Sequence, residues 1–213
     1  MKALRFLDQS IQEDYEQLLK IKGKPTAIPS DDQVEYLFVR SFYRDIPELG
    51  EAREAIRYYT RQAATNWKEY GLYSRAAIAW LMHQNGKKET TQDIVAWFRK
   101  TATDHAEKGM YWANNRNTFA SNRSAIETHC LIMALFQQTD PNQEQTDRMK
   151  HWLLNQKRTQ NWESVPATQN AIYALLLTGN SWIEETNVCH IRLNDATWST
   201  TDGETGTGYL KVN

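Results

Sequence analysis

The sequence predicts a mainly α fold, an arc or toroid of α/α helical hairpins followed by a short β appendage. Segments that are apolar almost all round alternate along the chain with segments that carry a single apolar stripe. The all-apolar segments recur about every 40 to 50 residues, which is the period of helical-hairpin repeats. Beyond Gly179 apolar and polar residues alternate, which is the pattern of strands.

The first helix is expected over residues 3–21, where apolar side chains recur at helical spacing, and the glycine and prolines of 23–29 end it. We expect it to be the outer helix of a hairpin whose inner partner lies upstream, so the chain is predicted to be a fragment of a longer protein. Ser30 and Gln33 have the spacing of a capping box and predict the start of an inner helix.

Three further helices continue the alternation. Residues 49–63 carry one apolar stripe among charged residues, which predicts a solvent-facing outer helix. Residues 72–82 are apolar nearly all round and stop at Gly86, so we expect a buried inner helix. Residues 90–103 again carry one stripe and are its expected outer partner.

The last three helices repeat the pattern. Ser121 is expected to open an inner helix over residues 125–136, and residues 142–156 form its amphipathic outer partner. A final inner helix over residues 167–177 follows Ser164 as its cap.

Helices that are buried all round favour an innermost position, and helices with one stripe cover them, which gives two concentric layers. Strands are expected at residues 187–193, 196–199 and 208–212. Strands this isolated are marginally stable, so we expect their partners in a neighbouring domain. The predicted domains are therefore a helical domain over 1–180 and, over 181–213, strands of a partly absent β-domain.

Composition excludes several classes of protein. The chain has 213 residues and a formal net charge of -1 without a dense basic run, so we expect no nucleic-acid partner. No run approaches the roughly 18 apolar residues of a membrane span, so we expect no membrane insertion. Cys130 and Cys189 are interpreted as buried free thiols, with a disulfide left open. Neither has metal-ligand spacing, so we expect no metal and no cofactor.

Four sequence motifs resemble the bacterial α2-macroglobulins, more narrowly the large multidomain type of Bacteroidetes-like bacteria. The motifs are Trp152-Leu-Leu-Asn-Gln-Lys-Arg-Thr-Gln160-Asn-Trp162, Ala171-Ile-Tyr-Ala-Leu-Leu in the last helix, Ser124-Ala-Ile-Glu127-Thr, and Glu204-Thr-Gly-Thr-Gly-Tyr209. The resemblance implies that the helices correspond to the thioester-domain toroid, of terpenoid-cyclase type. It also implies that the strands belong to the β-domain into which that toroid is inserted.

Family members with a working thioester use a Cys-x-x-Gln motif. Here Met133 stands three residues after Cys130, and Arg192 stands three residues after Cys189, so neither cysteine can form the thioester. The motif lies upstream, or this is a member without it. The resemblance therefore implies a non-enzymatic role in protease entrapment by protein–protein contact, within a periplasmic or cell-envelope protein. Proteases and the neighbouring domains are the expected partners.

A binding site is predicted on the rim that joins an outer helix to the next inner one, because loops at the ends of such elements meet ligands. There Trp112 and Trp162, flanked by polar residues, suggest a cup for sugars or peptides, and the alternative is that they only fill the interior. The predicted cup residues are Trp112, Asn115, Arg116, Arg123, Glu127 and Trp162.

A different class, an α/α-toroid polysaccharide lyase or glycoside hydrolase, stays open as the alternative. It would use Glu127, His129, Tyr111 and Arg123. Glu127 and His129 are two residues apart, so they point about 200° apart on a helix and cannot act on one atom together. An ion pair of Glu127 with Arg123, one turn earlier, is the structural interpretation. A third possibility is a self-contained helical scaffold that binds peptides on its concave face.

Overall fold

The computed structural model describes residues 2–21, 27–116, 123–159, 162–179, 190–193 and 196–199. The contacts between residues divide the chain into two compact units, Met1–Thr178 and Gly179–Asn213. The first unit is mainly helical, as the hydrophobic pattern predicts. The described part of the second is a two-stranded hairpin.

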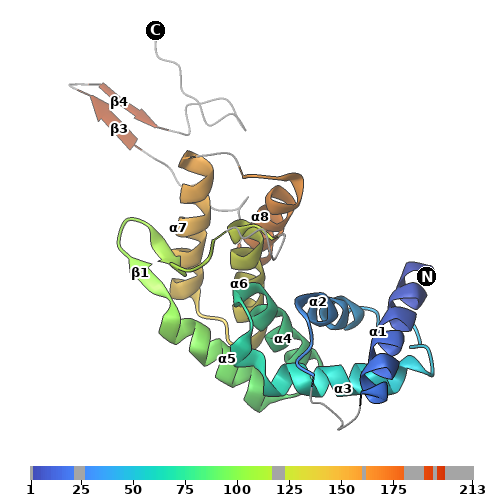
Figure 1. Ribbon diagram of the computed structural model, residues 1–213. Coiled ribbons are helices and arrows are strands. Elements are labelled where there is room, and N and C mark those ends of the chain that lie inside the picture. The colour runs from blue at the N-terminus through green and yellow to red at the C-terminus, as the bar shows by residue number, and fades with distance from the viewer. Residues whose placement is uncertain are drawn as a thin grey trace. The chain divides into compact units, whose positions relative to one another are not determined.

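The first unit contains helices, one 3₁₀ turn and one small hairpin (Figure 1). In chain order they are α1 (Lys2–Lys20), α2 (Asp31–Arg40), α3 (Ala52–Thr65), η1 (Trp67–Glu69), α4 (Leu72–Gln84), α5 (Lys88–Thr101), β1 (Thr103–His105), β2 (Gly109–Tyr111), α6 (Ala125–Thr139), α7 (Gln143–Thr159) and α8 (Val165–Thr178).

The helices of this unit pack in two layers (Figure 1). Helices α2, α4, α6 and α8 pack side by side in that order, and we call them the inner helices. Helix α3 covers α2, α5 covers α4, and α7 covers α6, while α1 packs on α3 and α2. The order of the helical hairpins is the one that the sequence predicts. The expected burial of the last inner helix is wrong: α8 packs through its small residues Ala167, Ala171 and Ala174, and its large side chains Ile172, Tyr173 and Leu176 are exposed.

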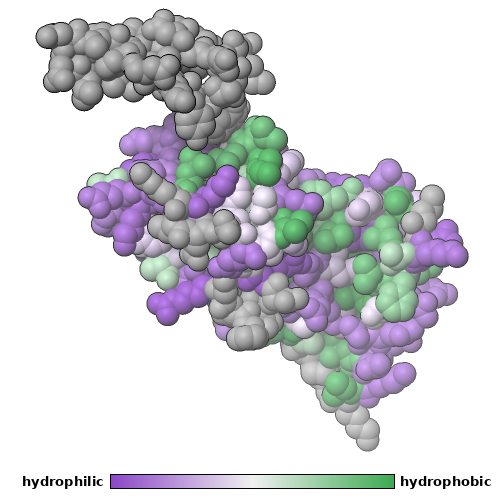
Figure 2. Space-filling model, turned by 90° about the horizontal axis from the view of Figure 1, so that it is seen from above, coloured by the Kyte–Doolittle hydropathy of each residue, from purple (hydrophilic) through white to green (hydrophobic). Residues whose placement is uncertain are grey.

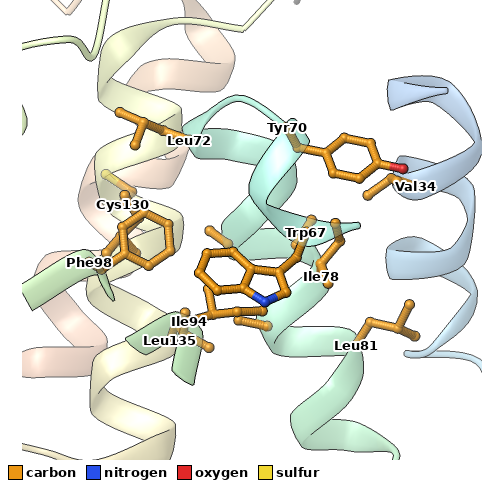
Figure 3. Packing of buried hydrophobic residues seen from close by; sticks show 14 of the residues in the cluster. Val34, Trp67, Tyr70, Leu72, Ile78, Leu81, Ile94, Phe98, Cys130 and Leu135 are labelled. Atoms are coloured by element: carbon orange, nitrogen blue, oxygen red, sulfur yellow. The ribbon is translucent and has the colours of Figure 1, made fainter. Parts of the chain in front are cut away.

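The hydrophobic core lies between the layers. Ile78 of α4, Ile94 and Phe98 of α5, and Leu135 of α6 are fully buried, and Figure 3 shows them in one apolar cluster. Each such side chain stabilises the fold by about 1.5 to 3 kcal/mol through burial. Residues of these three helices therefore share one interior.

Side-chain caps start three of the inner helices. Before α8, Ala167 N donates to Ser164 Oγ (3.2 Å), which confirms the predicted cap. Before α2, Gln33 N donates to Ser30 Oγ (3.2 Å) and Ser30 N donates to Gln33 Oε1 (3.0 Å), which confirms the predicted capping box. Before α6, Glu127 N donates to Ser124 Oγ (3.1 Å) and Ser124 N donates to Glu127 Oε2 (3.0 Å). Ser124, and not the expected Ser121, is therefore the cap of α6.

The hairpin of β1 and β2 is absent from the sequence-based prediction, which expects only a connection between helices here. Thr103 pairs with Tyr111, and His105 with Gly109. The hairpin is held on α7 by Arg148, whose guanidinium donates to Asp104 Oδ1 and, over 2.7 Å, to the carbonyl of His105. These contacts join residues more than forty positions apart, so no local sequence pattern predicts them.

In the second unit, β3 (His190–Leu193) pairs antiparallel with β4 (Ala196–Ser199), with His190 opposite Ser199. The strand expected at 196–199 is therefore confirmed, and it pairs with the preceding strand of this chain. Ser121, Cys189, the strand expected at 208–212 and the motif that ends at Tyr209 lie outside the described residues. No helix in the described part of the chain is long and apolar enough to cross a membrane.

Candidate functional site

A pocket opens on the inner helices, and all four of them contribute to its wall. We call it the inner pocket. It is lined by Phe38, Phe42, Tyr73, Trp80, Arg123, Glu127, Cys130, Leu131, Ala134, Asn170 and Tyr173. These residues lie on α2 or just after it, on α4, on α6 or just before it, and on α8, so the side-by-side packing of the inner helices creates the pocket.

Aromatic rings form one side of the inner pocket. Phe38 and Phe42 are one helical turn apart, and their ring centroids lie 5.1 Å from each other in an edge-to-face arrangement. Trp80 of α4 lies 5.9 Å from the Phe42 ring. Phe42 is 51% exposed and Tyr173, which also lines the pocket, is 62% exposed. The pocket therefore presents large aromatic surface to solvent.

Arg123 forms the polar side and joins three inner helices. Its guanidinium pairs with Glu35 of α2 and with Glu127 of α6, the latter at 3.4 Å. It also lies 4.9 Å from the ring centroid of Tyr73 of α4, at cation–π distance. The predicted pair of Arg123 and Glu127 is confirmed, and Glu35 is a partner that the sequence does not indicate.

Glu127 is 8% exposed, and both of its oxygens are used within the protein. Oε1 accepts from Arg123, and Oε2 accepts from the backbone N–H of Ser124. Burial, and then the charge of Glu127, raise the pKa of Tyr73 to about 12, so this phenol stays protonated at neutral pH. The carboxylate is thus held by a cation and a helix cap.

His129 lies on the far side of the same helix and is fully buried. Its Nε2 is 3.1 Å from the carbonyl oxygen of Met149, and its Nδ1 has no hydrogen-bond partner among the described residues. Burial lowers the pKa of His129 to about 4, so the ring is neutral at physiological pH and Nε2 carries the proton that it donates. Glu127 and His129 therefore do not meet, as their spacing predicts.

Cys130 is a buried free thiol in the wall of the inner pocket. Burial, and then the nearby charge of Glu127, raise its pKa to about 12. A thiol needs to ionise to act as a nucleophile, so this one is inert at neutral pH. The interpretation of Cys130 as a buried free thiol is confirmed.

The structure does not gather the six residues of the predicted rim cup at one place. Arg123 and Glu127 line the inner pocket, whereas Trp112 and Asn115 border a different one, beside Tyr111 and Trp152.

Trp112 is only 1% exposed, because its ring packs between Phe98 and His129 and its Nε1 donates to the carbonyl of Phe98 (3.0 Å). The expectation that Trp112 presents its indole to a ligand is therefore corrected. Its large apolar ring is more stable in the core.

The other members of the predicted cup also serve local structure or face solvent. Asn115 donates to the carbonyl of Ala125 at the start of α6 (2.8 Å), and Arg116 is exposed. Trp162 is half-buried against the core beneath Lys157, whose ammonium lies 5.0 Å from the ring.

The hydrophobic pattern of the sequence does not distinguish the aromatic residues of the inner pocket from core residues. Phe38 of α2 and Phe42, which follows the end of α2, share the face on which the sequence pattern expects core residues. An apolar face predicts burial along its whole length, and only the packing shows which part of that face remains open.

No protein-family model, no curated protein and no solved structure matches the chain. Within the described ranges, no group of three or more His, Cys, Asp or Glu side chains could hold a metal ion.

Proposed function

We propose that this chain is a non-enzymatic interaction domain that binds a segment of a partner protein at the inner pocket. The observation that carries the proposal is the exposure of Phe42 and Tyr173 around a pocket built by four helices. Exposed apolar groups that cluster on a soluble protein mark interaction sites. Figure 2 shows hydrophobic side chains gathered in patches between hydrophilic ones on the face seen from above.

The size of the inner pocket favours one large side chain as its occupant. Its volume is about 210 Å³, which is below the roughly 300 to 1,000 Å³ of typical small-molecule sites. Aromatic walls that surround one apolar anchor are the common form of an interface hot spot. Arg123 lines the pocket and supplies a positive charge beside this anchor.

The sequence resemblance gives this interaction its biological setting. We propose that the two-layered helices are part of an α/α toroid of terpenoid-cyclase type in a bacterial α2-macroglobulin-like protein of the periplasm or cell envelope. The partners are then proteases and the neighbouring domains of the full-length protein. The lack of a Cys-x-x-Gln motif at Cys130 and Cys189 supports a non-covalent contact.

The carbohydrate-active enzyme is the alternative, and the contacts of Glu127 weigh against it. An acid or base in catalysis needs a free position from which to exchange a proton with substrate. Glu127 is instead committed to Arg123 and Ser124. Retaining and inverting glycosidases also need a second carboxyl group about 5 to 9.5 Å away. Among the described residues, the other carboxylate in this ion-pair group is Glu35, and it binds the same arginine.

The proposal is tested by binding of the complete chain to proteases of several mechanistic classes, each inactivated at its catalytic residue so that it cannot digest the chain. Biolayer interferometry measures the dissociation constant. We expect binding by at least one class, and we expect Phe42→Ala and Tyr173→Ala each to weaken it about tenfold, which is the loss of one hot-spot side chain.

Phe6→Ala is the matched control, because Phe6 is 70% exposed on α1 and lies outside the inner pocket. It is expected to leave the dissociation constant unchanged. Equal affinity of all three variants and the parent chain would remove the inner pocket as the site. Cleavage of a polysaccharide that is lost in Glu127→Gln would replace the proposal with the enzyme alternative.

A further inference from the structure

Helix α3 carries three arginines on one exposed line. Arg53, Arg57 and Arg61 are spaced by four residues, and all three are exposed. We call them the arginine row. At 1.5 Å of rise per residue the row is about 12 Å long. The opposite face of α3 is buried through Ala55, Tyr59 and other residues, so the row points away from the core.

Carboxylates balance the arginine row only in part within the described residues. None of its guanidinium groups forms an ion pair with a described carboxylate. Like charges four residues apart on a helix each cost about 0.2 to 0.5 kcal/mol. The chain as a whole has a net charge of -1, so this concentration of positive charge is local. An external anionic partner would offset the repulsion.

A tyrosine cluster lies at the edge of the row. Arg53, Arg57 and Arg61 line one pocket of about 430 Å³ together with Tyr15 of α1 and Tyr58 of α3. The ring centroids of the two tyrosines are 5.1 Å apart. The two rings therefore give this pocket an aromatic edge beside the guanidinium groups.

One carboxylate also lines this pocket, and it has a partner. Glu54 Oε1 accepts a hydrogen bond from Tyr15 Oη over 3.3 Å. This contact directs the carboxylate towards α1. The pocket therefore keeps a net charge of about +2 from its ionised side chains at neutral pH, since three guanidiniums face one carboxylate.

We propose that the arginine row binds an extended acidic segment of a partner protein, with a carboxylate at every second residue. Alternate side chains of an extended chain lie about 6.6 Å apart on one side, close to the roughly 6 Å between successive arginines of the row. Guanidinium groups bind carboxylates through two parallel hydrogen bonds. The row is on the outer layer, so this surface is independent of the proposed function of the inner pocket.

The row fits an acidic peptide better than a nucleic acid. Nucleic-acid binding depends on many phosphate contacts along a continuous basic surface. The row offers three cations, and the same pocket contains the carboxylate of Glu54. A short run of carboxylates matches both its length and its charge.

Fluorescence anisotropy of a labelled (Glu-Ser)4 peptide with the complete chain tests the proposal. We expect saturable binding that weakens as salt is added, and no binding of (Lys-Ser)4 or (Gln-Ser)4. Arg57→Glu is expected to weaken binding about tenfold, because it removes the central attraction and adds a repulsion. This variant also relieves the repulsion with Arg53 and Arg61, so its melting temperature is expected to stay or rise.

Lys100→Glu is the control, because it makes the same change of charge at an exposed site on α5 and is expected to leave the affinity unchanged. If Lys100→Glu weakens peptide binding as much as Arg57→Glu does, the loss depends on the net charge of the chain and not on the arginine row. That result would overturn the proposal. Absence of (Glu-Ser)4 binding at low salt would also overturn it. Binding of a single-stranded oligothymidylate as tight as that of the peptide would replace the acidic segment with a nucleic acid.

Discussion

Asp8 and Arg40 form a buried ion pair between α1 and α2, with Arg40 Nε 3.1 Å from Asp8 Oδ1. The pair is fully hydrogen-bonded: Asp8 also accepts from Tyr36 Oη (2.6 Å) and from the backbone N–H of Leu49 (3.2 Å). The remaining guanidinium donors of Arg40 reach the carbonyls of Tyr43 and Ile46. This network joins α1, α2 and the loop before α3, so it fixes the N-terminal helix on the array.

We expect Asp8→Ala to lower the free energy of unfolding by about 3 to 5 kcal/mol, since it leaves the Arg40 charge buried without a counter-charge. Urea unfolding followed by circular dichroism measures the change. Glu13→Gln is the control on the same helix, because Glu13 is exposed and bonded only to Gln9 in the described structure. A loss in Asp8→Ala no larger than in this control would contradict a structural role for the pair.

Gly109 is expected to resist substitution, for two reasons. Its φ of +81° is unfavourable for other residues, and an added Cβ would lie 2.7 Å from Trp152 N and closer still to the carbonyl of Arg148. Gly109→Ala should therefore separate the hairpin from α7 and cost about 2 kcal/mol or more in unfolding free energy.

Gly86→Ala separates these two causes. Gly86 also has a positive φ, of +69°, but nothing lies within 4 Å of its added Cβ. We expect this control to cost only about 1 kcal/mol, the cost of the left-handed conformation. Thermal melts of both variants measure the difference, and equal losses would mean that the contact with α7 contributes nothing.

His129 should make the fold sensitive to acid. Burial lowers its pKa to about 4 from 6.5, so the folded state binds the proton less readily than the unfolded state. The stability that this group contributes is present above pH 6.5 and is lost as the pH falls from 6.5 to about 4, by at most about 3 kcal/mol.

His129→Gln removes this titration and is expected to flatten the decline of unfolding free energy between pH 6.5 and pH 4 relative to the parent chain. Denaturant unfolding at a series of pH values measures it. His151→Gln, at an exposed position of the neighbouring α7, is expected to leave the decline unchanged. A parallel pH dependence of parent and His129→Gln would show that His129 does not titrate in this way.

Trp112→Phe should affect stability and leave binding at the inner pocket intact. The change removes the hydrogen bond to the Phe98 carbonyl and creates a void in a fully packed site, at an expected cost of about 2 kcal/mol. The Phe98 carbonyl keeps the backbone N–H of Ala102 as a donor, so it is not left unpaired. Calorimetry and the protease-binding assay check both parts. If Trp112→Phe abolishes protease binding but leaves the stability unchanged, Trp112 is part of a binding site.

The candidate site could be predicted in part from the sequence. The ion pair of Arg123 with Glu127 follows from a spacing of four residues at the start of a predicted helix, and the buried thiol of Cys130 follows from the apolar pattern of that helix. Glu35, the second partner of Arg123, lies on another inner helix. Nothing in a local pattern relates two residues that far apart in sequence.

The sequence by itself determined the helices and their alternation, because helical spacing and caps such as Ser30 depend on residues within one or two turns of each other. Only the tertiary structure decided which apolar faces stay open. The sequence pattern places Phe98 and Phe42 on apolar faces alike, yet Phe98 is fully buried in the core while Phe42 remains half exposed. It also decided that Asp8 is buried and Trp112 internal, since burial depends on long-range packing between helices.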